Sequence, residues 1–387
     1  MPWESYGAWG STIGSLTMIY FDNAATSYPK PQAVKREIMR ALNECGGNPG
    51  RGAHSLSLAA AELVYDARAS VAELFGIDEP ERVVFTSGAT AALNLAIKTS
   101  VRPGMHVLIS DREHNAVARP LFRLCDEGVI DLDIYPTSGN ILAEIESRIR
   151  PATGLVVTCH VSNVTGFAQP VEAIGELCKS RGIRYVVDAA GSAGHLPIDL
   201  NALQCDALCA PGHKGLLGIP GVGIAILSGA EGFPEFIEGG SGVDSLSRRM
   251  PSTLPERYEA GTLPTPAIAA LGAGIQYLLR EGVDKIAEKE AKLRSCLLRG
   301  LAGIDGITVY EPENTVGPVA FTHSAHPPEE LAALLDERGI AVRAGYHCAP
   351  LAHKAAGTPP GGAVRVSIGI CNRHREIEEL LDILRHL

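Results

Sequence analysis

Short apolar runs rich in β-branched residues alternate with amphipathic stretches along most of the chain. A strand turns every second side chain to the same face, whereas a helix repeats its apolar face every three to four residues. On this basis we expect strands at Arg82–Thr86, His106–Ser110, Ile130–Tyr135, Leu155–Cys159, Arg184–Asp188, Ala207–Cys209 and Gly223–Leu227. Helices are expected at Pro31–Glu44, Leu58–Phe75, Ala89–Lys98, Ala116–Glu127, Val171–Ser180 and Pro266–Arg280.

This alternation predicts an α/β fold with a mostly parallel, seven-stranded sheet covered by helices on both faces. Ligands of such sheets bind beyond the carboxyl ends of the strands. Functional side chains are therefore expected in the loops that follow the predicted strands.

The pattern changes after a long helical region that runs from Pro266 to about Gly303. Strands are then expected at Ile307–Tyr310, Val316–Phe321, Ile340–Arg343 and Ala363–Ile368, and helices at Pro327–Arg338 and Arg373–Leu387. We expect a large domain over residues 44–275 and a small α+β domain over residues 276–387. Residues 18–43 are expected to pack with the small domain, and residues 1–17 to form a flexible extension.

Composition and charge limit the class of function. The 387 residues are 45% hydrophobic and 20% charged, which is typical of a folded globular protein. A net charge of −10 without any Lys/Arg-rich run argues against nucleic acid as a partner. No apolar run is long enough for a membrane span, and the N-terminal segment lacks the pattern of a secretory signal, so we expect a cytoplasmic protein. The nine cysteines are scattered, which predicts neither structural disulfides nor a metal site.

Two residues after neighbouring predicted strands indicate cofactor chemistry. Lys214 lies in a loop between Gly212 and Gly215, where the backbone can approach a bulky ligand and the amine can form a Schiff base. Asp188 directly follows an apolar strand, and its carboxylate suits the protonated ring nitrogen of pyridoxal phosphate. Taken singly, Lys214 is better explained as a solvated loop lysine, and Asp188 is equally well explained as a capping residue. The combination of the two favours the cofactor.

Two further loops add to this interpretation. The sequence Thr86-Ser87-Gly88-Ala89-Thr90 joins a strand to a helix, and free N–H groups at such a helix start bind phosphate. His114 follows another strand, where its imidazole is able to stack on a planar ring. The alternatives are a simple helix cap and an ordinary surface histidine.

Together these segments resemble a known family, the class V aminotransferase-like enzymes of fold type I, which depend on pyridoxal 5′-phosphate. The resemblance extends from Met18 to Leu387 and is carried by Asp22–Thr26, Thr86–Thr90, Glu113–Asn115, His160–Asn163, Val187–Ala190 and Gly212–Lys214. Within that class, Arg343–Ala349 resembles the active-site cysteine segment of cysteine desulfurases and selenocysteine lyases, in the group with a short cysteine loop.

The resemblance implies a role for each matching residue. Lys214 would hold the cofactor as a Schiff base, Asp188 would pair with the ring nitrogen, and His114 would stack on the ring. The other expected cofactor contacts are Ala89, Thr90 and His213 at the phosphate, Asn163 near the phenolic oxygen and the substrate, and Thr262 at the phosphate of a neighbouring subunit. The contribution of Thr262 implies a homodimer.

The same resemblance implies a substrate site and a nucleophile. Arg365 would clamp the substrate α-carboxylate, since its planar fork suits a bidentate grip, while His54 and Arg343 would line the pocket. Cys348 would attack the sulfur of L-cysteine as a thiolate, with Lys214 as the base and His114 taking part in proton transfer. The products would be L-alanine and a persulfide on Cys348. The alternative for Cys348 is an inert, packed side chain.

Two positions depart from the family pattern. Gly191 stands where a glutamine commonly contacts the phenolic oxygen, and Pro211 stands where a serine or threonine commonly contacts the phosphate. These departures imply either weaker cofactor binding or contacts from other groups, such as Ser192 or water. Six matching segments outweigh two hydrogen bonds of roughly 0.5–3 kcal/mol each.

Other functions stay open at this point. A selenocysteine lyase would use the same cofactor and arginine, a class V aminotransferase would leave no persulfide, and a non-catalytic scaffold would have kept only the fold. The sulfur acceptor is equally open: an iron-sulfur cluster assembly scaffold, a thiolation enzyme, a selenium pathway or a small thiol.

Overall fold

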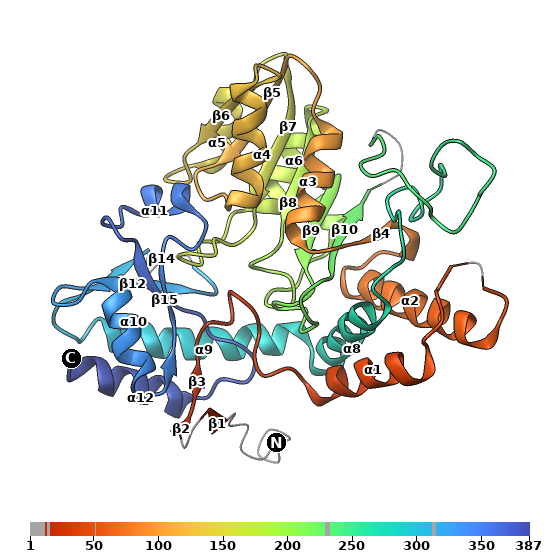
Figure 1. Cartoon of the computed structure of the whole chain (residues 1–387). Coiled ribbons are helices and arrows are strands. Elements are labelled where there is room, and N and C mark those ends of the chain that lie inside the picture. Colours follow the sequence, from red (N-terminus) through yellow and green to blue (C-terminus); the bar gives the residue numbers. More distant parts are fainter. Residues whose placement is uncertain (1–11, 14–15, 51, 229–232, 312–314) are drawn as a thin grey trace.

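The computed structural model describes residues 12–13, 16–50, 52–228, 233–311 and 315–387, which form a large and a small domain (Figure 1). The strands of the large domain are β4 (Val83–Thr86), β5 (Met105–Ser110), β6 (Ile130–Tyr135), β7 (Thr153–Cys159), β8 (Arg184–Asp188), β9 (Ala207–Pro211) and β10 (Gly223–Leu227). They form a sheet in the order β4-β10-β9-β8-β7-β5-β6, in which only β10 runs antiparallel to its neighbours. The predicted seven-stranded, mostly parallel sheet is confirmed.

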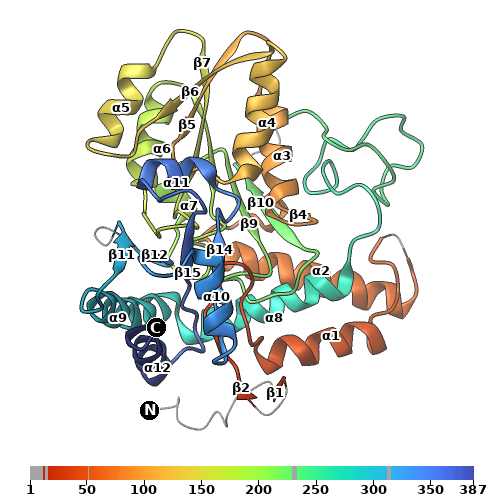
Figure 2. The same ribbon diagram turned by 60° about the vertical axis from the view of Figure 1, so that its left-hand side comes forward.

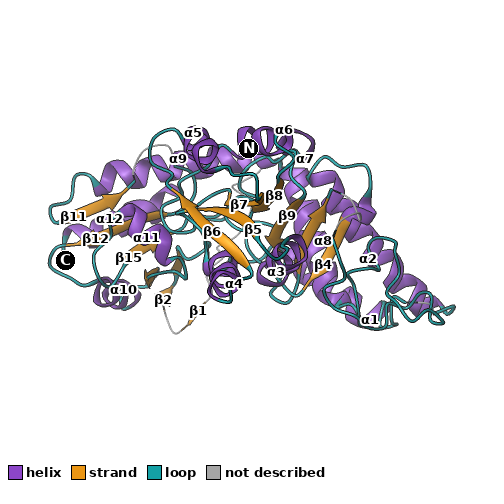
Figure 3. Cartoon of the chain, turned by 90° about the horizontal axis from the view of Figure 1, so that it is seen from above, coloured by secondary structure: helices purple, strands orange, loops and turns teal. Residues whose placement is uncertain are grey.

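Helices cover both faces of this sheet, as the near-continuous apolar strands predicted. They are α2 (Ser55–Leu74), α3 (Ala89–Ser100), α4 (Asn115–Asp126), α5 (Ile141–Arg148), α6 (Val171–Ser180), α7 (Leu200–Leu203) and α8 (Thr265–Glu281). Consecutive residues of β7 face opposite sides of the sheet. Val156 packs in the core under α2 and α5–α8, and Val157 packs in the core under α3 and α4. Figure 3 shows α3 and α4 on the other side of the sheet from α5–α7.

The small domain is built on an antiparallel sheet in the order β11-β12-β15-β14. Its elements are α9 (Val283–Leu301), β11 (Ile307–Tyr310), β12 (Val319–His323), α10 (Pro328–Asp336), β13 (Ile340–Ala341), β14 (Arg343–Gly345), α11 (Pro350–Ala356), β15 (Ala363–Val366) and α12 (His374–Arg385). Leu297 of α9, Leu331 of α10 and Leu380 of α12 meet in one core beneath the sheet.

The N-terminal segment divides between the two domains. β3 (Ile19–Tyr20) pairs in parallel with β13, and Phe21 enters the small-domain core, so the start of the segment packs with the small domain. In contrast, α1 (Gln32–Glu44) packs on α8 and α2 of the large domain (Figure 2). The segment therefore spans both domains.

Three differences from the expected elements have local causes. The domain boundary at residue 275 falls inside α8, and the long helical region instead breaks at Gly282, whose φ of 85° separates α8 from α9. The expected strand Ile340–Arg343 is split into β13 and β14, which join different sheets. The short helices α5, α7 and α11 were not expected.

Of the predicted extension, residues 12–13 and 16–17 form the strand pair β1 (Thr12–Ile13) and β2 (Leu16–Thr17), and the rest lies outside the described residues. Across the described ranges, the helices are all too short or too polar to cross a lipid bilayer.

Phe21 tests whether the N-terminal segment belongs to the small-domain core. Its side chain is fully buried, so Phe21→Ala should lower the free energy of unfolding by about 3–5 kcal/mol, as measured by urea denaturation. Leu246→Ala is the matched control because Leu246 is fully exposed. A loss below about 1 kcal/mol for Phe21→Ala would contradict this packing.

Candidate active site

A cavity of about 600 Å³ lies at the carboxyl ends of the large-domain strands, where the small domain covers them. The loops after β4, β5, β7, β8 and β9 contribute to it, together with β14, β15 and the turn between β14 and α11. The predicted site residues that line it are Ala89, Thr90, His114, Asn163, Asp188, His213, Lys214, Arg343, Cys348 and Arg365.

Hydrogen bonds from the N-terminal segment hold the loop of Lys214. Ser27 Oγ donates to the Lys214 carbonyl oxygen at 2.8 Å, and Lys30 Nζ donates to the His213 carbonyl oxygen at 2.7 Å. Thr26 Oγ1 donates to the same His213 oxygen at 3.1 Å. The backbone on either side of the lysine is thus fixed from behind, while its side chain faces the cavity.

The environment of the Lys214 amine favours its neutral form. Burial, aided by the nearby Arg365 guanidinium, lowers the pKa of Lys214 to about 8, although the Asp188 carboxylate opposes this shift. A substantial fraction of the amine is then unprotonated near neutral pH. The side chain is accordingly able to act as a nucleophile or as a base.

Asp188 ends β8 and lies at the floor of the cavity. Its Oδ1 accepts a hydrogen bond from Ala190 N at 2.8 Å, and its residue is 4% exposed. Burial raises the pKa of Asp188, while the hydrogen bond from Ala190 N and the nearby Lys214 amine lower it. Among the described ion pairs none includes this carboxylate, so it is available to a cationic group of a ligand.

The turn after β4 forms an anion cradle. Gly88 has a φ of 151°, and α3 begins at Ala89 without a side-chain cap, so the first N–H groups of α3 point into the cavity. Gly223 of β10 lies directly behind, because a Cβ at that position would be 2.5 Å from the Gly88 carbonyl carbon. The sequence places glycine where the two backbones meet.

His114 caps α4 and is neutral. Its Nδ1 accepts a hydrogen bond from Ala116 N at 3.0 Å, which leaves the ring proton on Nε2. Burial and the nearby Lys214 and Arg119 cations lower the pKa of His114 to about 4. Burial likewise lowers the pKa of His213 to about 4. His213 thus offers a neutral imidazole to the cavity, and its expected contact with the phosphate stays a prediction.

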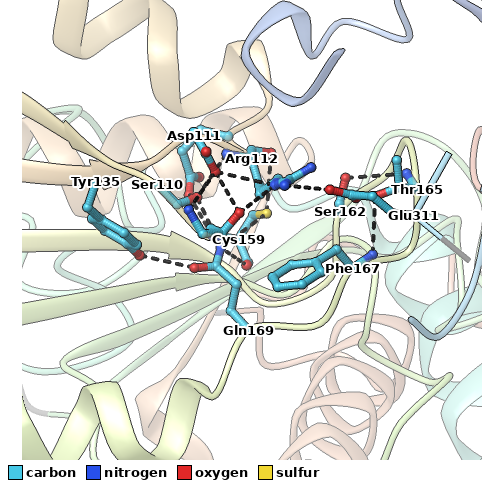
Figure 4. Close-up of polar contacts among 12 residues, drawn as sticks. Ser110, Asp111, Arg112, Tyr135, Cys159, Ser162, Thr165, Phe167, Gln169 and Glu311 are labelled. Atoms are coloured by element: carbon cyan, nitrogen blue, oxygen red, sulfur yellow. Dashed lines mark hydrogen bonds and ion pairs between the residues drawn. The ribbon is translucent and has the colours of Figure 1, made fainter. Parts of the chain in front are cut away.

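A buried polar network supports the His114 loop from below (Figure 4). Glu113 Oε1 accepts hydrogen bonds from Ser110 Oγ and from Cys159 N, and Gln169 Nε2 donates to Ser110 Oγ at 3.0 Å. Burial raises the pKa of Glu113 to about 8, so this carboxyl group is largely protonated at neutral pH. The network joins the ends of β5 and β7 and fixes the loops that follow them.

Arg112 connects the same loop to the small domain. Its guanidinium forms an ion pair with Glu311, which follows β11, and Nε donates to Thr137 Oγ1 at 2.6 Å. It also lies 5.1 Å from the ring centre of Phe167. Figure 4 shows Arg112 reaching toward Glu311, with Phe167 beside them.

Cys348 lies in a tight turn with an unusual backbone. His347 and Cys348 have φ values of 49° and 57°, and Ala349 N donates to the Tyr346 carbonyl oxygen at 2.9 Å to close the turn. Two successive non-glycine residues in the left-handed region cost on the order of 1–3 kcal/mol each. The conformation therefore requires support from the surrounding structure.

Two hydrogen bonds from the large domain supply that support. Asn163 Nδ2 donates to the His347 carbonyl oxygen and Asn115 N donates to the Cys348 carbonyl oxygen, both at 2.8 Å. The thiol itself is exposed and lines the cavity, so the alternative of a packed, inert cysteine is wrong for this structure. Burial lowers the pKa of His347 to about 3, which makes its imidazole a neutral neighbour.

Arg365 is the most buried cation of the cavity. It is 2% exposed, and its Nη1 donates to the Asn163 carbonyl oxygen at 3.0 Å. Its Nη2 pairs with Asp22 Oδ1 at 2.8 Å, and the other Asp22 oxygen pairs with Arg343. Burial lowers the pKa of Arg365, and the Asp22 carboxylate opposes this shift.

Two predicted site residues lie outside this cavity. His54 is exposed and caps α2, where its Nδ1 accepts a hydrogen bond from Ser57 N. Thr262 is exposed, and its Oγ1 lies 3.5 Å from Asn48 Nδ2. Their assigned roles stay predictions.

The two departures from the family pattern have different structural meanings. A Cβ at position 191 would lie 2.5 Å from the Val161 carbonyl oxygen, so the backbone leaves no room for a glutamine there. Pro211 ends β9 opposite Gly223 and offers no hydroxyl. Ser192 is buried and its hydroxyl donates to the Ala189 carbonyl oxygen, and its part in replacing these contacts stays a prediction.

Sequence reasoning missed several residues that position the site. Asp22, Thr26 and Asn115 belong to segments that were recognised as motifs, yet none of them received a role. Ser27 and Lys30 carried no signal of their own, because each acts through contacts with residues distant in the sequence.

Comparison with known proteins agrees with this arrangement. The family model described as aminotransferase class-V matches residues 19–380. The probable cysteine desulfurase of Methanothermobacter thermautotrophicus is 35% identical over 95% of this chain and 94% of that protein, and the cysteine desulfurase of Salmonella typhimurium is 32% identical over 95% and 93%. The solved apo structure of the cysteine desulfurase from Thermococcus onnurineus has a TM-score of 0.88 at 31% identity, and covers 95% of this chain and 94% of that one. The cysteine desulfurase CsdA of Escherichia coli, with a TM-score of 0.85, 24% identity and the same coverage, supports the fold alone.

The lowered pKa of Lys214 is directly testable in the cofactor-free protein. Reductive methylation of Lys214, followed by peptide mass spectrometry across pH, should show a midpoint at about 8, since only the neutral amine reacts. An ordinary lysine amine is less than about 1% neutral at that pH. The exposed Lys292 serves as the reference amine in the same digest. A Lys214 midpoint above about 10 would contradict the described environment.

Proposed function

The chain belongs to the class-V aminotransferase family, whose members depend on pyridoxal phosphate, and within it to the cysteine desulfurases; from this premise we propose that it removes sulfur from L-cysteine at the Lys214 cavity and holds it as a persulfide on Cys348. The observation that carries the proposal is that an exposed thiol, an amine whose pKa is lowered to about 8 and a buried arginine line one cavity.

The cavity fits pyridoxal phosphate on four counts. The uncapped start of α3 with Thr90 suits the phosphate, and Lys214 suits the aldehyde. Asp188 is a buried carboxylate with room for a cationic ring nitrogen, and the neutral His114 suits the face of a planar ring. When bound, the cofactor withdraws electrons from the α-carbon of the amino acid joined to it.

The residues of the chain account for the other parts of the reaction. Arg365, with Arg343, binds the substrate carboxylate, because a guanidinium fork grips a carboxylate at two points. Lys214 takes the α-proton as its neutral amine. His114 is neutral and carries its ring proton on Nε2, so this group is able to donate a hydrogen bond to a ligand in the cavity.

Cys348 completes the transfer. Its thiolate attacks the substrate sulfur; a sulfur–sulfur bond forms as the carbon–sulfur bond breaks, and the carbon fragment keeps the bonding electrons. Protonation of that fragment gives L-alanine. The constrained turn supports this role, because it presents the thiol to the cavity at a fixed place.

A homodimer is part of the proposal. Apolar side chains of α1 and α2 are more than half exposed, namely Met39 (55%), Leu42 (57%), Leu58 (59%) and Tyr65 (56%). Asn48, between these two helices, lies beside Thr262, and His54 starts α2. The two predicted site residues that miss the cavity of their own chain thus adjoin the exposed apolar helices, as expected if they serve the site of a second copy.

Cys348→Ser tests the role of the thiol. The variant should lose at least about 100-fold in alanine formation from L-cysteine and keep the visible absorbance of bound cofactor, since Lys214 is untouched. Cys371→Ser is the matched control, because Cys371 is also exposed but does not line the cavity. Undiminished turnover by Cys348→Ser would contradict the role of Cys348 as the nucleophile. Loss of turnover with L-cysteine but not with L-selenocysteine would favour a selenocysteine lyase.

Charge placed on the exposed helices tests the dimer. The double change Leu42→Glu and Leu58→Glu should shift the protein from dimer to monomer in sedimentation velocity, because buried carboxylates without partners are costly. Lys292→Glu on α9 is the control. A wild-type monomer would contradict the proposed dimer, and a dimer that survives the double change would contradict this interface.

A further inference from the structure

Asp22 lies between the two arginines of the cavity and pairs with both. Its Oδ1 accepts from Arg365 Nη2 at 2.8 Å, while its Oδ2 accepts from Arg343 Nε and Nη2, each at 2.9 Å. Arg365 belongs to β15 and Arg343 to β14, which are neighbours in the small sheet. One carboxylate from the N-terminal segment therefore bridges two cations that β14 and β15 place directly opposite each other.

Asp22 acts on these arginines from behind. It is buried and does not line the cavity, whereas both arginines do. Its backbone is fixed, because its carbonyl oxygen accepts from Ala25 N at 3.0 Å and from the Tyr20 hydroxyl at 3.1 Å. The position of the carboxylate is thus set by the fold of the N-terminal segment.

The charges of this group do not cancel. Two guanidinium groups and one carboxylate leave one net positive charge, and it faces the cavity. Arg343 and Arg365 both line that cavity. Arg365 Nε is buried and has no hydrogen-bond partner among the described residues. The group therefore matches a ligand that brings one negative charge.

We propose that Asp22 is a positioning and specificity residue: it orients Arg343 and Arg365 and offsets one of their charges, so that the cavity favours amino acids with a single negative carboxylate. This inference rests on the proposed function, because it assigns the arginines to the substrate carboxylate. A second carboxylate on the substrate meets no unpaired positive charge at the clamp. Acidic amino acids are thereby disfavoured against neutral ones of the same size.

L-Aspartate and L-asparagine are the probes, because they differ in one charge and hardly in size. The measured quantity is the ratio of the dissociation constants of L-aspartate and L-asparagine from the holoenzyme, obtained by titration calorimetry. The wild type should bind L-asparagine more tightly. In Asp22→Asn the net charge of the clamp rises to two, and the ratio should shift by about tenfold or more toward L-aspartate, as expected for one added charge nearby in a partly screened site.

Arg343→Gln makes the test reciprocal. Alone it removes one positive charge, and the ratio should shift away from L-aspartate; the side chain of Arg343 is 51% exposed, so the fold tolerates the change. In the double variant with Asp22→Asn the net charge returns to one, and the ratio should return close to the wild-type value. Asp133→Asn is the matched control, since Asp133 pairs with Arg150 away from the cavity.

Asp22→Asn should also raise KM for L-cysteine more than it lowers kcat, because the clamp binds the same carboxylate throughout the reaction. Asp22→Glu, which keeps the charge, should recover part of the loss. An unchanged ratio in a folded Asp22→Asn, or a double variant that behaves as Asp22→Asn, would overturn the inference. If Asp22→Asn does not fold, an unchanged binding ratio in Arg343→Gln would overturn the inference instead.

The failures of the two proposals are distinguishable. A protein whose binding ratio shifts as described, but which forms no alanine from L-cysteine, contradicts the proposed function alone. A protein that forms alanine but keeps one ratio in all variants contradicts the role of Asp22 alone.

Discussion

The geometry of the site depends on the burial of one arginine. Arg365 extends from the centre of the small-domain sheet and is held by the Asp22 carboxylate and by the Asn163 carbonyl oxygen. These partners come from the N-terminal segment and from the large domain, so the charge is accommodated only when three parts of the chain are assembled. Removing one partner of a buried ion pair typically lowers the folding stability by about 3–5 kcal/mol, so this contact strongly stabilises the arrangement of the two domains.

The same cation influences the protonation of the groups around it. Together with burial, it lowers the pKa of Lys214 and of His114, and it acts on His347 in the same direction. The cavity thus combines a fixed positive charge for an anion with neutral imidazoles and a lysine amine of lowered pKa beside it. Carboxylate binding and proton removal are assigned to different side chains, and the placement of Arg365 serves both.

The sequence was sufficient for the sheet and for the residues that face the cavity. Strands buried on both faces read as continuous apolar runs, and functional residues lie at or just beyond their carboxyl ends, as Asp188 ends β8 and Lys214 follows β9. The supporting contacts were not predictable, because they are distant in sequence: Asp22 meets Arg365 across 343 positions. Gly191 shows the opposite error, since it was interpreted as a lost hydrogen bond and is instead required by the nearby backbone of Val161.

The central claim is that sulfur from the substrate arrives on Cys348 and on no other cysteine. The most direct measurement is peptide mass spectrometry of the anaerobic holoenzyme after one equivalent of L-cysteine. The account predicts one added sulfur atom on the Cys348 peptide and none on the peptides of the other cysteines, including the exposed Cys371. Added sulfur on another cysteine, or alanine formed without any protein-bound sulfur, would contradict it.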